Sequence, residues 1–269
     1  MTDFVTVSAL AARIGNGAKL ALPVDYAGVA MAATDAIIAR APRDLHLVCV
    51  PTGGLQVDML LGAGLVGTLE TSAVSLGEAG SAPCFVRGVR GEAFRLMDAT
   101  CPAIHAGLIA AQKGVPFLPL RGLIGSDLVT RRPDWKVIDN PFGENDPIVL
   151  IPAIEPDVCL FHAPEADRMG NVWIGRRREL ATMAYASKRT LVTVERIRED
   201  SLLADEKTAA GVLPALYVDA VAKVPNGAWP YALWGEYAAD GEEIGRYAEA
   251  ARTQEGFEAF MAARAEKAA

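Results

Sequence analysis

Residues Leu45–Leu61 have the sequence LHLVCVPTGGLQVDMLL, whose three parts each indicate a different backbone conformation. Leu45–Val50 is a nearly continuous apolar run with β-branched residues, which is typical of an interior parallel strand covered on both faces. Pro51–Gly54 is a turn, and Leu55–Leu61 is an apolar helical run. Strand, turn and helix in this order form half of a βαβ unit, so we expect a parallel sheet.

The same alternation of strand and helix continues on both sides of this stretch. Further strands are predicted at Lys19–Leu22, Thr68–Leu76, Val115–Leu120, Ile148–Ile154, Val158–His162 and Thr190–Val194. Helices are predicted at Val7–Ile14, Asp25–Arg40, Ala103–Gln112, Glu179–Ala186 and Gly241–Ala269. Thr130–Asp146 is polar and aperiodic and is predicted to be a long surface loop. We expect an α/β fold in which an open, mostly parallel sheet carries helices on both faces, the strands after Ile148 continue that sheet, and residues 1–269 form one domain.

Charge and composition exclude several classes of function. The net charge of −7 and the isoelectric point near 5.1 argue against nonspecific nucleic-acid binding, which needs a broad basic surface. The one basic run, Arg176–Arg178, is interpreted as a solvated helix start. The N-terminus has no basic region before an apolar core, and no uncharged apolar stretch reaches the ~18 residues of a membrane span. We expect a cytoplasmic protein that does not contact a membrane.

The cysteines and histidines favour structural roles. Cys49, Cys84, Cys101 and Cys159 form no C-x-x-C pair and have no histidine at zinc-site spacing, so reduced thiols, no metal and no redox cofactor are expected. Cys101 precedes Pro102 at a predicted helix start, the one position that favours a reactive thiolate, although a structural role is more common. The three histidines lie on apolar segments, which favours buried, hydrogen-bonded residues over catalytic bases: His46, His105 and His162.

Gly62–Gly67 matches G-x-G-x-x-G, the pattern of a dinucleotide-binding loop. Such a loop follows a strand and opens a helix, so that the pyrophosphate lies at the helix N-terminus. Here the glycines follow a helical run and precede a strand, and Arg87 stands about 20 residues on, where a ribose-binding acid is expected. They are therefore interpreted as a helix end. The sequence has neither G-x-x-x-x-G-K-[ST] nor G-x-S-x-G, which argues against P-loop and ordinary α/β-hydrolase sites.

Pro51–Gly54 is a candidate ligand-binding turn, because ligands of open parallel sheets bind at the carboxyl ends of strands. Its two glycines allow backbone N–H groups to approach an acyl or phosphate oxygen. Alternatively, they serve a tight turn that needs positive φ angles. Glu70 and Glu78 flank the end of the next predicted strand. Each is either a site residue or a charged residue of the loop, and their spacing does not decide between these two interpretations.

Four longer segments occur in the order Gly107–Leu128 (GLIAAQKGVPFLPLRGLIGSDL), Asn140–Gly175, Leu180–Ile197 and Val218–Ala232 (VDAVAKVPNGAWPYA). Together they resemble the A (alpha) subunit of family I CoA-transferases, in the branch that includes glutaconate CoA-transferase. The resemblance extends from about Ala21 to Asp240.

The resemblance implies an α/β fold of the CoA-transferase type and an enzyme that moves coenzyme A between an acyl-CoA thioester and a carboxylic acid. In this family the reaction is ping-pong: a glutamate attacks the thioester, giving an acyl anhydride and then a glutamyl-CoA thioester. That glutamate usually belongs to the B (beta) subunit, so a partner chain is implied, and Glu70, Glu78 and Glu165 are not assigned as the nucleophile. Coenzyme A and acyl-CoA enter as substrates, and no permanently bound cofactor is implied.

The resemblance also implies which residues face the cleft between the two subunits. By position these are Thr52, Gly53 and Gly54 of the turn, then Glu78, then Asp98, Thr100 and Cys101 of the loop Asp98–Pro102. Relatives often carry Glu, Gln or Asn where Cys101 stands, so this loop departs from the family pattern. Two alternatives remain: one chain of a hydrolase that opens the ring of a cyclic acyl-CoA compound, and a noncatalytic paralogue that binds acyl-CoA. The acid and the thioester are not specified.

Overall fold

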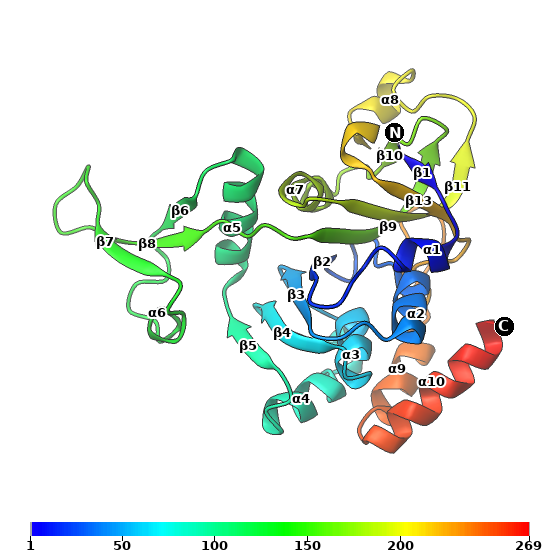
Figure 1. Ribbon diagram of the computed structural model, residues 1–269, viewed down its shortest axis with the longest axis horizontal. Coiled ribbons are helices and arrows are strands. Elements are labelled where there is room, and N and C mark those ends of the chain that lie inside the picture. The colour runs from blue at the N-terminus through cyan, green and yellow to red at the C-terminus, as the bar shows by residue number, and fades with distance from the viewer. Residues whose placement is uncertain (1, 269) are drawn as a thin grey trace.

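A sheet of ten strands runs through the centre of the computed structural model, which describes residues 2–268 (Figure 1). Met1, and Ala269 at the end of the predicted C-terminal helix, lie outside the described residues. The strands of the main sheet are β1 (Asp3–Phe4), β2 (Lys19–Pro23), β3 (Leu45–Val50), β4 (Val66–Thr71), β5 (Arg95–Asp98), β9 (Val158–Asp167), β10 (Val172–Trp173), β11 (Thr190–Arg198), β12 (Val212–Leu213) and β13 (Ala220–Lys223). A second, small sheet contains β6 (Phe117–Leu120), β7 (Lys136–Asp139) and β8 (Pro147–Pro152).

Helices connect most of these strands. They are α1 (Val7–Ala11), α2 (Met31–Arg40), α3 (Leu55–Gly62), α4 (Pro83–Arg90), α5 (Cys101–Lys113), α6 (Leu128–Arg131), α7 (Arg178–Ala186), α8 (Glu206–Ala209), α9 (Gly241–Ala250) and α10 (Gln254–Ala268), with the 3-10 helices η1 (Gly77–Ala79) and η2 (Ala215–Tyr217). In residues 2–268 no helix combines the length and the apolar character needed to cross a membrane.

The strand order of the main sheet is β1-β13-β11-β9-β2-β3-β4-β5, and every pair of neighbours along this path is parallel. β10 and β12 add an antiparallel extension at β9. The chain moves outward from β2 to β5, returns to β9 beside β2, and then moves outward in the other direction. The predicted open parallel sheet is confirmed, and its switch point lies between β2 and β9.

Side chains of the central strands alternate between two cores, because successive residues of a strand point to opposite faces. Leu47 and Cys49 of β3 pack with α1, α2, α3 and α9, whereas Val48 and Val50 pack with α5 and α7. The two groups of helices lie on opposite sides of the sheet (Figure 1). Helices on both faces are therefore confirmed, as is the interior position of Leu45–Val50.

Two predicted strands belong to the small sheet and not to the main one. Val115–Leu120 and Ile148–Ile154 contain β6 and β8, which pair antiparallel with each other, while β7 pairs with the other edge of β8. The small sheet extends to one side of the main sheet (Figure 1). β6 and β8 contain prolines, which lack the N–H donor that an interior parallel strand needs. β7 lies inside Thr130–Asp146, predicted to be a loop, and its four residues are all exposed, so no hydrophobic pattern marked it.

Three other helix boundaries can be compared with those predicted from the sequence. α2 begins at Met31 and not at Asp25, because residues 25–28 form a turn in which Gly28 has a φ of +88°. The C-terminal helix is divided into α9 and α10, and the Oγ1 atom of Thr253 accepts a hydrogen bond from the N–H of Gly256 at the start of the second helix (3.0 Å). Gly62 is the last residue of α3 and is followed by a strand, so the interpretation of Gly62–Gly67 as a helix end is confirmed.

Asp58 in α3 holds three helices together and is fully buried. Its carboxylate accepts hydrogen bonds from the N–H groups of Cys84 (3.2 Å) and Phe85 (2.7 Å) at the start of α4, and from the hydroxyl of Tyr247 in α9 (2.7 Å). Burial raises the pKa of Asp58, and these hydrogen bonds oppose the rise. The docking of α4 and α9 on α3 therefore depends on one buried carboxyl group.

Replacing Tyr247 with phenylalanine removes one hydrogen bond to Asp58 and keeps the aromatic ring in place. We expect the free energy of unfolding to fall by about 1–3 kcal/mol, because a buried acceptor loses a partner. Urea unfolding measures the difference, and Tyr26→Phe is the matched control, since Tyr26 is 72% exposed. A Tyr247→Phe variant as stable as the unmodified protein would contradict this role of Asp58.

Candidate functional site

The turn after β3 lies against the segment that leaves β4, at the carboxyl ends of the two strands. The N–H of Gly53 donates to the carbonyl of Ala73 (2.9 Å), and the N–H of Ser75 donates to the carbonyl of Gly53 (3.0 Å). The hydroxyl and the N–H of Ser72 both donate to the carbonyl of Pro51 (2.8 and 3.1 Å). Thr52 and Gly53 therefore lie on the edge of the sheet where open parallel sheets bind ligands.

Close packing, and not a positive φ angle, explains the glycines of this turn. Neither Gly53 nor Gly54 has a positive φ, and that of Gly54 is −132°, so the tight-turn explanation is wrong. A Cβ atom on Gly54 would lie 1.8 Å from an oxygen of the Asp25 carboxyl group, and one on Gly53 would lie 2.9 Å from the sulfur of Cys49. Residue 54 must be glycine because Asp25 packs directly on it, and residue 53 because Val57 and Cys49 do.

Asp25 lies in the loop that follows β2, next to the N-terminus of α3. The hydroxyl of Tyr231 accepts a hydrogen bond from the N–H of Leu55, the first residue of α3 (2.7 Å). Burial raises the pKa of Asp25 to about 6, and a hydrogen bond from Tyr231 opposes part of this rise. The edge thus holds a carboxyl group that gains and loses its proton near neutral pH, a property suited to general acid–base catalysis.

Helix α5 begins at the same edge with Cys101. Thr100 caps the helix, and its Oγ1 accepts a hydrogen bond from the N–H of Ala103 (3.3 Å). The exposed sulfur of Cys101 lies 3.2 Å from the hydroxyl of Ser72. Ser72 therefore joins the turn after β3 to the loop after β5. We call the residues gathered here the edge site: Asp25, Thr52, Gly53, Gly54, Ser72, Thr100 and Cys101.

Two residues expected in the site stand apart from this group. Asp98 ends β5 with an exposed side chain, and its carbonyl accepts a hydrogen bond from Nη1 of Arg132 (3.2 Å). Glu78 is exposed in η1, a few residues beyond Ser75. Within residues 2–268, neither carboxylate has a hydrogen bond or ion pair with an edge-site residue.

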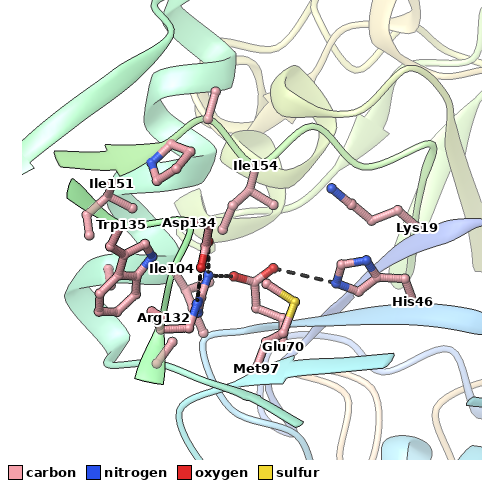
Figure 2. Close-up of a pocket in the computed structure, with 14 residues that line it drawn as sticks. Lys19, His46, Glu70, Met97, Ile104, Arg132, Asp134, Trp135, Ile151 and Ile154 are labelled. Atoms are coloured by element: carbon pink, nitrogen blue, oxygen red, sulfur yellow. Dashed lines mark hydrogen bonds and ion pairs between the residues drawn. The ribbon is translucent and has the colours of Figure 1, made fainter. Parts of the chain in front are cut away.

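Glu70 is not a loop charge, because it lies in β4 and is only 3% exposed. Its Oε1 accepts a hydrogen bond from Nη2 of Arg132 (2.7 Å), and the same arginine binds Asp134 (2.8 Å). Arg132 therefore links Glu70 to the carbonyl of Asp98 and supports the loop 98–101 from inside the protein. Figure 2 shows this ion pair at the wall of a cavity.

A second buried polar group lies beside the switch point. Nδ1 of His162 lies 2.8 Å from the hydroxyl of Thr193, and Nε2 lies 2.7 Å from Oε1 of Glu195. Glu195 also accepts hydrogen bonds from the hydroxyl of Tyr237 (2.8 Å) and the N–H of Asn226 (2.7 Å). His162 is thus buried and hydrogen-bonded, as predicted. This network anchors the loop that leads from β13 to Tyr231 and so to the edge site.

Three of the residues that organise the edge were not singled out from the sequence: Asp25, Ser72 and Tyr231. An acidic residue two positions after a strand was the available signal for Asp25. Tyr231 lies within the recognised segment Val218–Ala232. Ser72 had no local signal, because its partners Pro51 and Cys101 are 21 and 29 residues away.

The edge site combines an acid–base carboxyl group, an exposed thiol, hydroxyl groups and the first turns of α3 and α5. The first N–H groups of a helix lack partners within it and carry the positive end of its dipole. In this protein the N–H of Leu55 donates to Tyr231, the N–H of Ala103 donates to Thr100, and Pro102 has no N–H. The dipole of α5 at the exposed residue Cys101 is therefore what remains to stabilise an oxygen that gains negative charge. Among residues 2–268, no three His, Cys, Asp or Glu side chains are grouped as metal ligands.

Known proteins with similar sequences and structures point to one family. The profile of a family described as Coenzyme A transferase matches residues 5–224. The A chain of 3-oxoadipate CoA-transferase from Pseudomonas knackmussii is 34% identical, over 97% of this chain and 93% of its own. The structure of glutaconate coenzyme A-transferase from Acidaminococcus fermentans matches with a TM-score of 0.90 at 28% identity, over 97% of this chain and 88% of that one. A variant of the decarboxylase AibA/AibB matches with a TM-score of 0.87 at 27% identity, over 98% of each chain.

Asp25→Asn isolates the effect of the edge carboxyl group on stability. Its pKa is about 6 in the folded protein against an ordinary value of 3.8, so between about pH 4 and pH 6 the folded state binds more protons than the unfolded chain. The stability that Asp25 contributes is therefore fully present below about pH 4 and is lost as the pH rises through 6, by roughly 2–3 kcal/mol.

We expect the unmodified protein to lose this amount relative to Asp25→Asn when urea unfolding is compared at pH 4 and pH 7. Asp139→Asn, a change in exposed β7, is the control. A difference between the protein and Asp25→Asn that stays constant over this range would show that Asp25 titrates normally.

Proposed function

The chain belongs to the coenzyme A transferase family, and from this premise we propose that it is the A subunit of a hetero-oligomeric CoA-transferase. The proposed enzyme moves coenzyme A between an acyl-CoA thioester and a carboxylic acid. The names of its relatives support this role in the assembly, since two of them are A subunits of CoA-transferases. The substrates of those relatives differ, so the acid that this enzyme uses is left open.

One observation carries the proposal of a divided active site. The edge site has groups that bind and transfer protons, yet in residues 2–268 no glutamate carboxylate has a hydrogen bond or ion pair with any of its members. Glu70, the glutamate of the neighbouring strand, is engaged with Arg132 inside the protein. A partner chain that supplied a glutamate against Thr52–Gly54 would complete the site.

In the proposed reaction, a glutamate carboxylate of the B chain attacks the carbonyl carbon of the thioester. The bond between the acyl carbon and sulfur breaks, coenzyme A leaves as a thiolate, and an anhydride of the acyl group and the glutamate remains. The thiolate then attacks the glutamyl carbonyl carbon, which releases the first acid and forms a glutamyl-CoA thioester. A second acid takes over the coenzyme A by the same steps in reverse.

The role proposed for this chain is to bind and polarise the reacting groups. The positive end of the α5 dipole, at the exposed residue Cys101, would stabilise the oxygen that becomes negative during each attack. Asp25 would change the charge beneath the α3 turn when it titrates, and Cys101 with Ser72 would line the opposite wall. Positioning of this kind accelerates a reaction without a nucleophile on the positioning chain.

The first test uses the chain alone and in complex with a B-type chain. We expect no coenzyme A transfer from the chain alone, and transfer between an acyl-CoA and an acid when both chains are present. Mass spectrometry of the complex after mixing with acyl-CoA should find a coenzyme A adduct on a glutamate of the B chain.

Transfer by the isolated chain would contradict the divided site. Thioester loss from the complex with free acid and no adduct would instead support a hydrolase, and release of carbon dioxide would support a decarboxylase. An acyl-CoA that binds to the complex without any turnover would support the noncatalytic alternative.

A second test maps the partner surface through Cys101. Because Cys101 is exposed and Cys49, Cys84 and Cys159 are buried, we expect iodoacetamide to modify one thiol rapidly and the reaction to disappear in Cys101→Ser. In the complex, the B chain should slow this modification by at least about tenfold, which intact-mass measurements follow over time. Modification at the same rate in the complex would place the partner elsewhere.

A further inference from the structure

The basic run Arg176–Arg178 lies between β10 and α7 and takes no part in the edge site. Arg178 is the first residue of α7, and α7 packs beside α5. Burial lowers the pKa of His105, about one turn into α5, and the charge of Glu179 opposes this effect. The start of α7 is therefore close to the first turns of α5, which itself begins at the edge site. We call Arg176, Arg177 and Arg178 the basic cluster.

Arg177 is not part of a solvated helix start, which corrects the prediction from the sequence for this residue. Its guanidinium group lies over the indole ring of Trp234, with Cζ 3.3 Å from the ring centroid. Arg177 is half-buried, whereas Arg176 and Arg178 are exposed as predicted. Nε of Arg177 is buried and has no hydrogen-bond partner within residues 2–268, and across the same residues its Nη groups form no hydrogen bond. Stacking on the ring fixes the plane of these free donors.

The basic cluster has no counter-ion in the described part of the chain, residues 2–268. None of its three side chains forms an ion pair with a carboxylate there. Nη2 of Arg178 donates to the carbonyl of Ala210 (3.0 Å), which is a neutral acceptor. Burial and the charge of Arg176 lower the pKa of Arg177, and Glu179 opposes this shift. Arginine remains charged in spite of such shifts, so the cluster would be stabilised by an anion.

The loop after β2 connects the basic cluster to the edge site. At the start of this loop, Asp25 packs on Gly54 of the edge site. At its end, a Cβ atom on Gly28 would lie 3.2 Å from the ring of Trp234, on whose face Arg177 is stacked. One short loop thus separates the two groups of residues. A ligand that occupied both would have its anionic end at the arginines and its other end at the turn after β3.

We propose that the basic cluster, Arg176–Arg178, binds the phosphate groups of coenzyme A while the thioester lies at the edge site. This inference rests on the proposed function and assigns the end of the substrate that the edge site does not hold. The pantetheine arm of coenzyme A separates the phosphate groups from the sulfur, so the molecule needs an anion-binding surface apart from the reacting groups. Guanidinium groups bind phosphate oxygens through paired, charge-assisted hydrogen bonds, and several arginines suit several phosphate groups.

Isothermal titration calorimetry of the complex with coenzyme A tests this site, with pantetheine as the probe that lacks phosphate. Arg177→Met should weaken coenzyme A binding by at least about tenfold and leave pantetheine binding unchanged. Arg176→Gln changes an exposed side chain, so the fold should be unaffected, and should weaken coenzyme A binding by about threefold or more. Arg90→Met, at the exposed end of α4, is the matched control and should not change either affinity.

Steady-state kinetics distinguish the phosphate groups from the carboxylate of the second substrate. Because the phosphate groups take no part in bond breaking, Arg177→Met should raise the KM for acyl-CoA by at least about tenfold and leave kcat nearly unchanged. The KM for the acid should also stay the same. A higher KM for the acid, with that for acyl-CoA unchanged, would overturn the proposal and place the carboxylate of the acid at Arg177.

The binding measurements also separate this inference from the proposed function. Equal affinity of the unmodified and Arg177→Met complexes for coenzyme A would overturn the phosphate site and leave the transferase proposal intact. Binding that depends on Arg177 in a complex that transfers no coenzyme A would support the site and contradict the transferase. Absence of coenzyme A binding to the unmodified complex would overturn both. Thermal unfolding confirms that each variant is folded.

Discussion

The short parallel pairing between β2 and β9 is the constraint on which the rest of the structure depends. Only Leu20 with Val158 and Ala21 with Cys159 are paired in register. Asp157 strengthens this pairing, since its carboxylate accepts from the N–H of Lys19 (2.9 Å) and its own N–H donates to the carbonyl of Lys19 (2.8 Å). At the other end of the seam, the N–H of His162 donates to the carbonyl of Gly28 (2.7 Å). Connections leave the two strands in opposite directions, and the loop from β2 carries Asp25 to the edge site.

Packing around Asp25 then fixes the edge site. The carboxyl group occupies the space that a side chain at residue 54 would need, and Tyr231 joins it to the first N–H of α3. Tyr231 comes from a distant part of the chain, whose loop is held by Glu195 and His162. The carboxyl group of Asp25 therefore contacts segments from both halves of the sheet: the turn after β3 and Tyr231, which follows β13. Its burial, which raises its pKa to about 6, follows from the same contacts that position the turn.

Local patterns in the sequence predicted most of the helices and strands. Contacts between residues far apart in the chain determine which sheet a strand joins and which side chains meet at the edge site. Leu45–Leu61 was predicted correctly because a buried strand and an apolar helix each leave a pattern within a few residues. β6 and β8 were also recognised as strands, but an apolar run does not specify which sheet it joins. β5, with the sequence RLMD, lies at an edge of the main sheet and is largely exposed, so it has no apolar run. The family was recognised from whole segments of sequence. The contacts of Asp25 and Ser72 join residues that are far apart in the chain, and no local sequence pattern indicates that they are in contact.

Hydrogen–deuterium exchange of this chain, alone and bound to a B-type chain, tests most directly whether the edge site is half of a divided active site. We predict that the partner slows exchange in the segments 24–28, 51–55, 72–76 and 98–103, which meet at the edge. Exchange in the small sheet and in α9 and α10 should change less. Protection confined to other surfaces, with unchanged exchange in these four segments, would contradict a divided site at this edge.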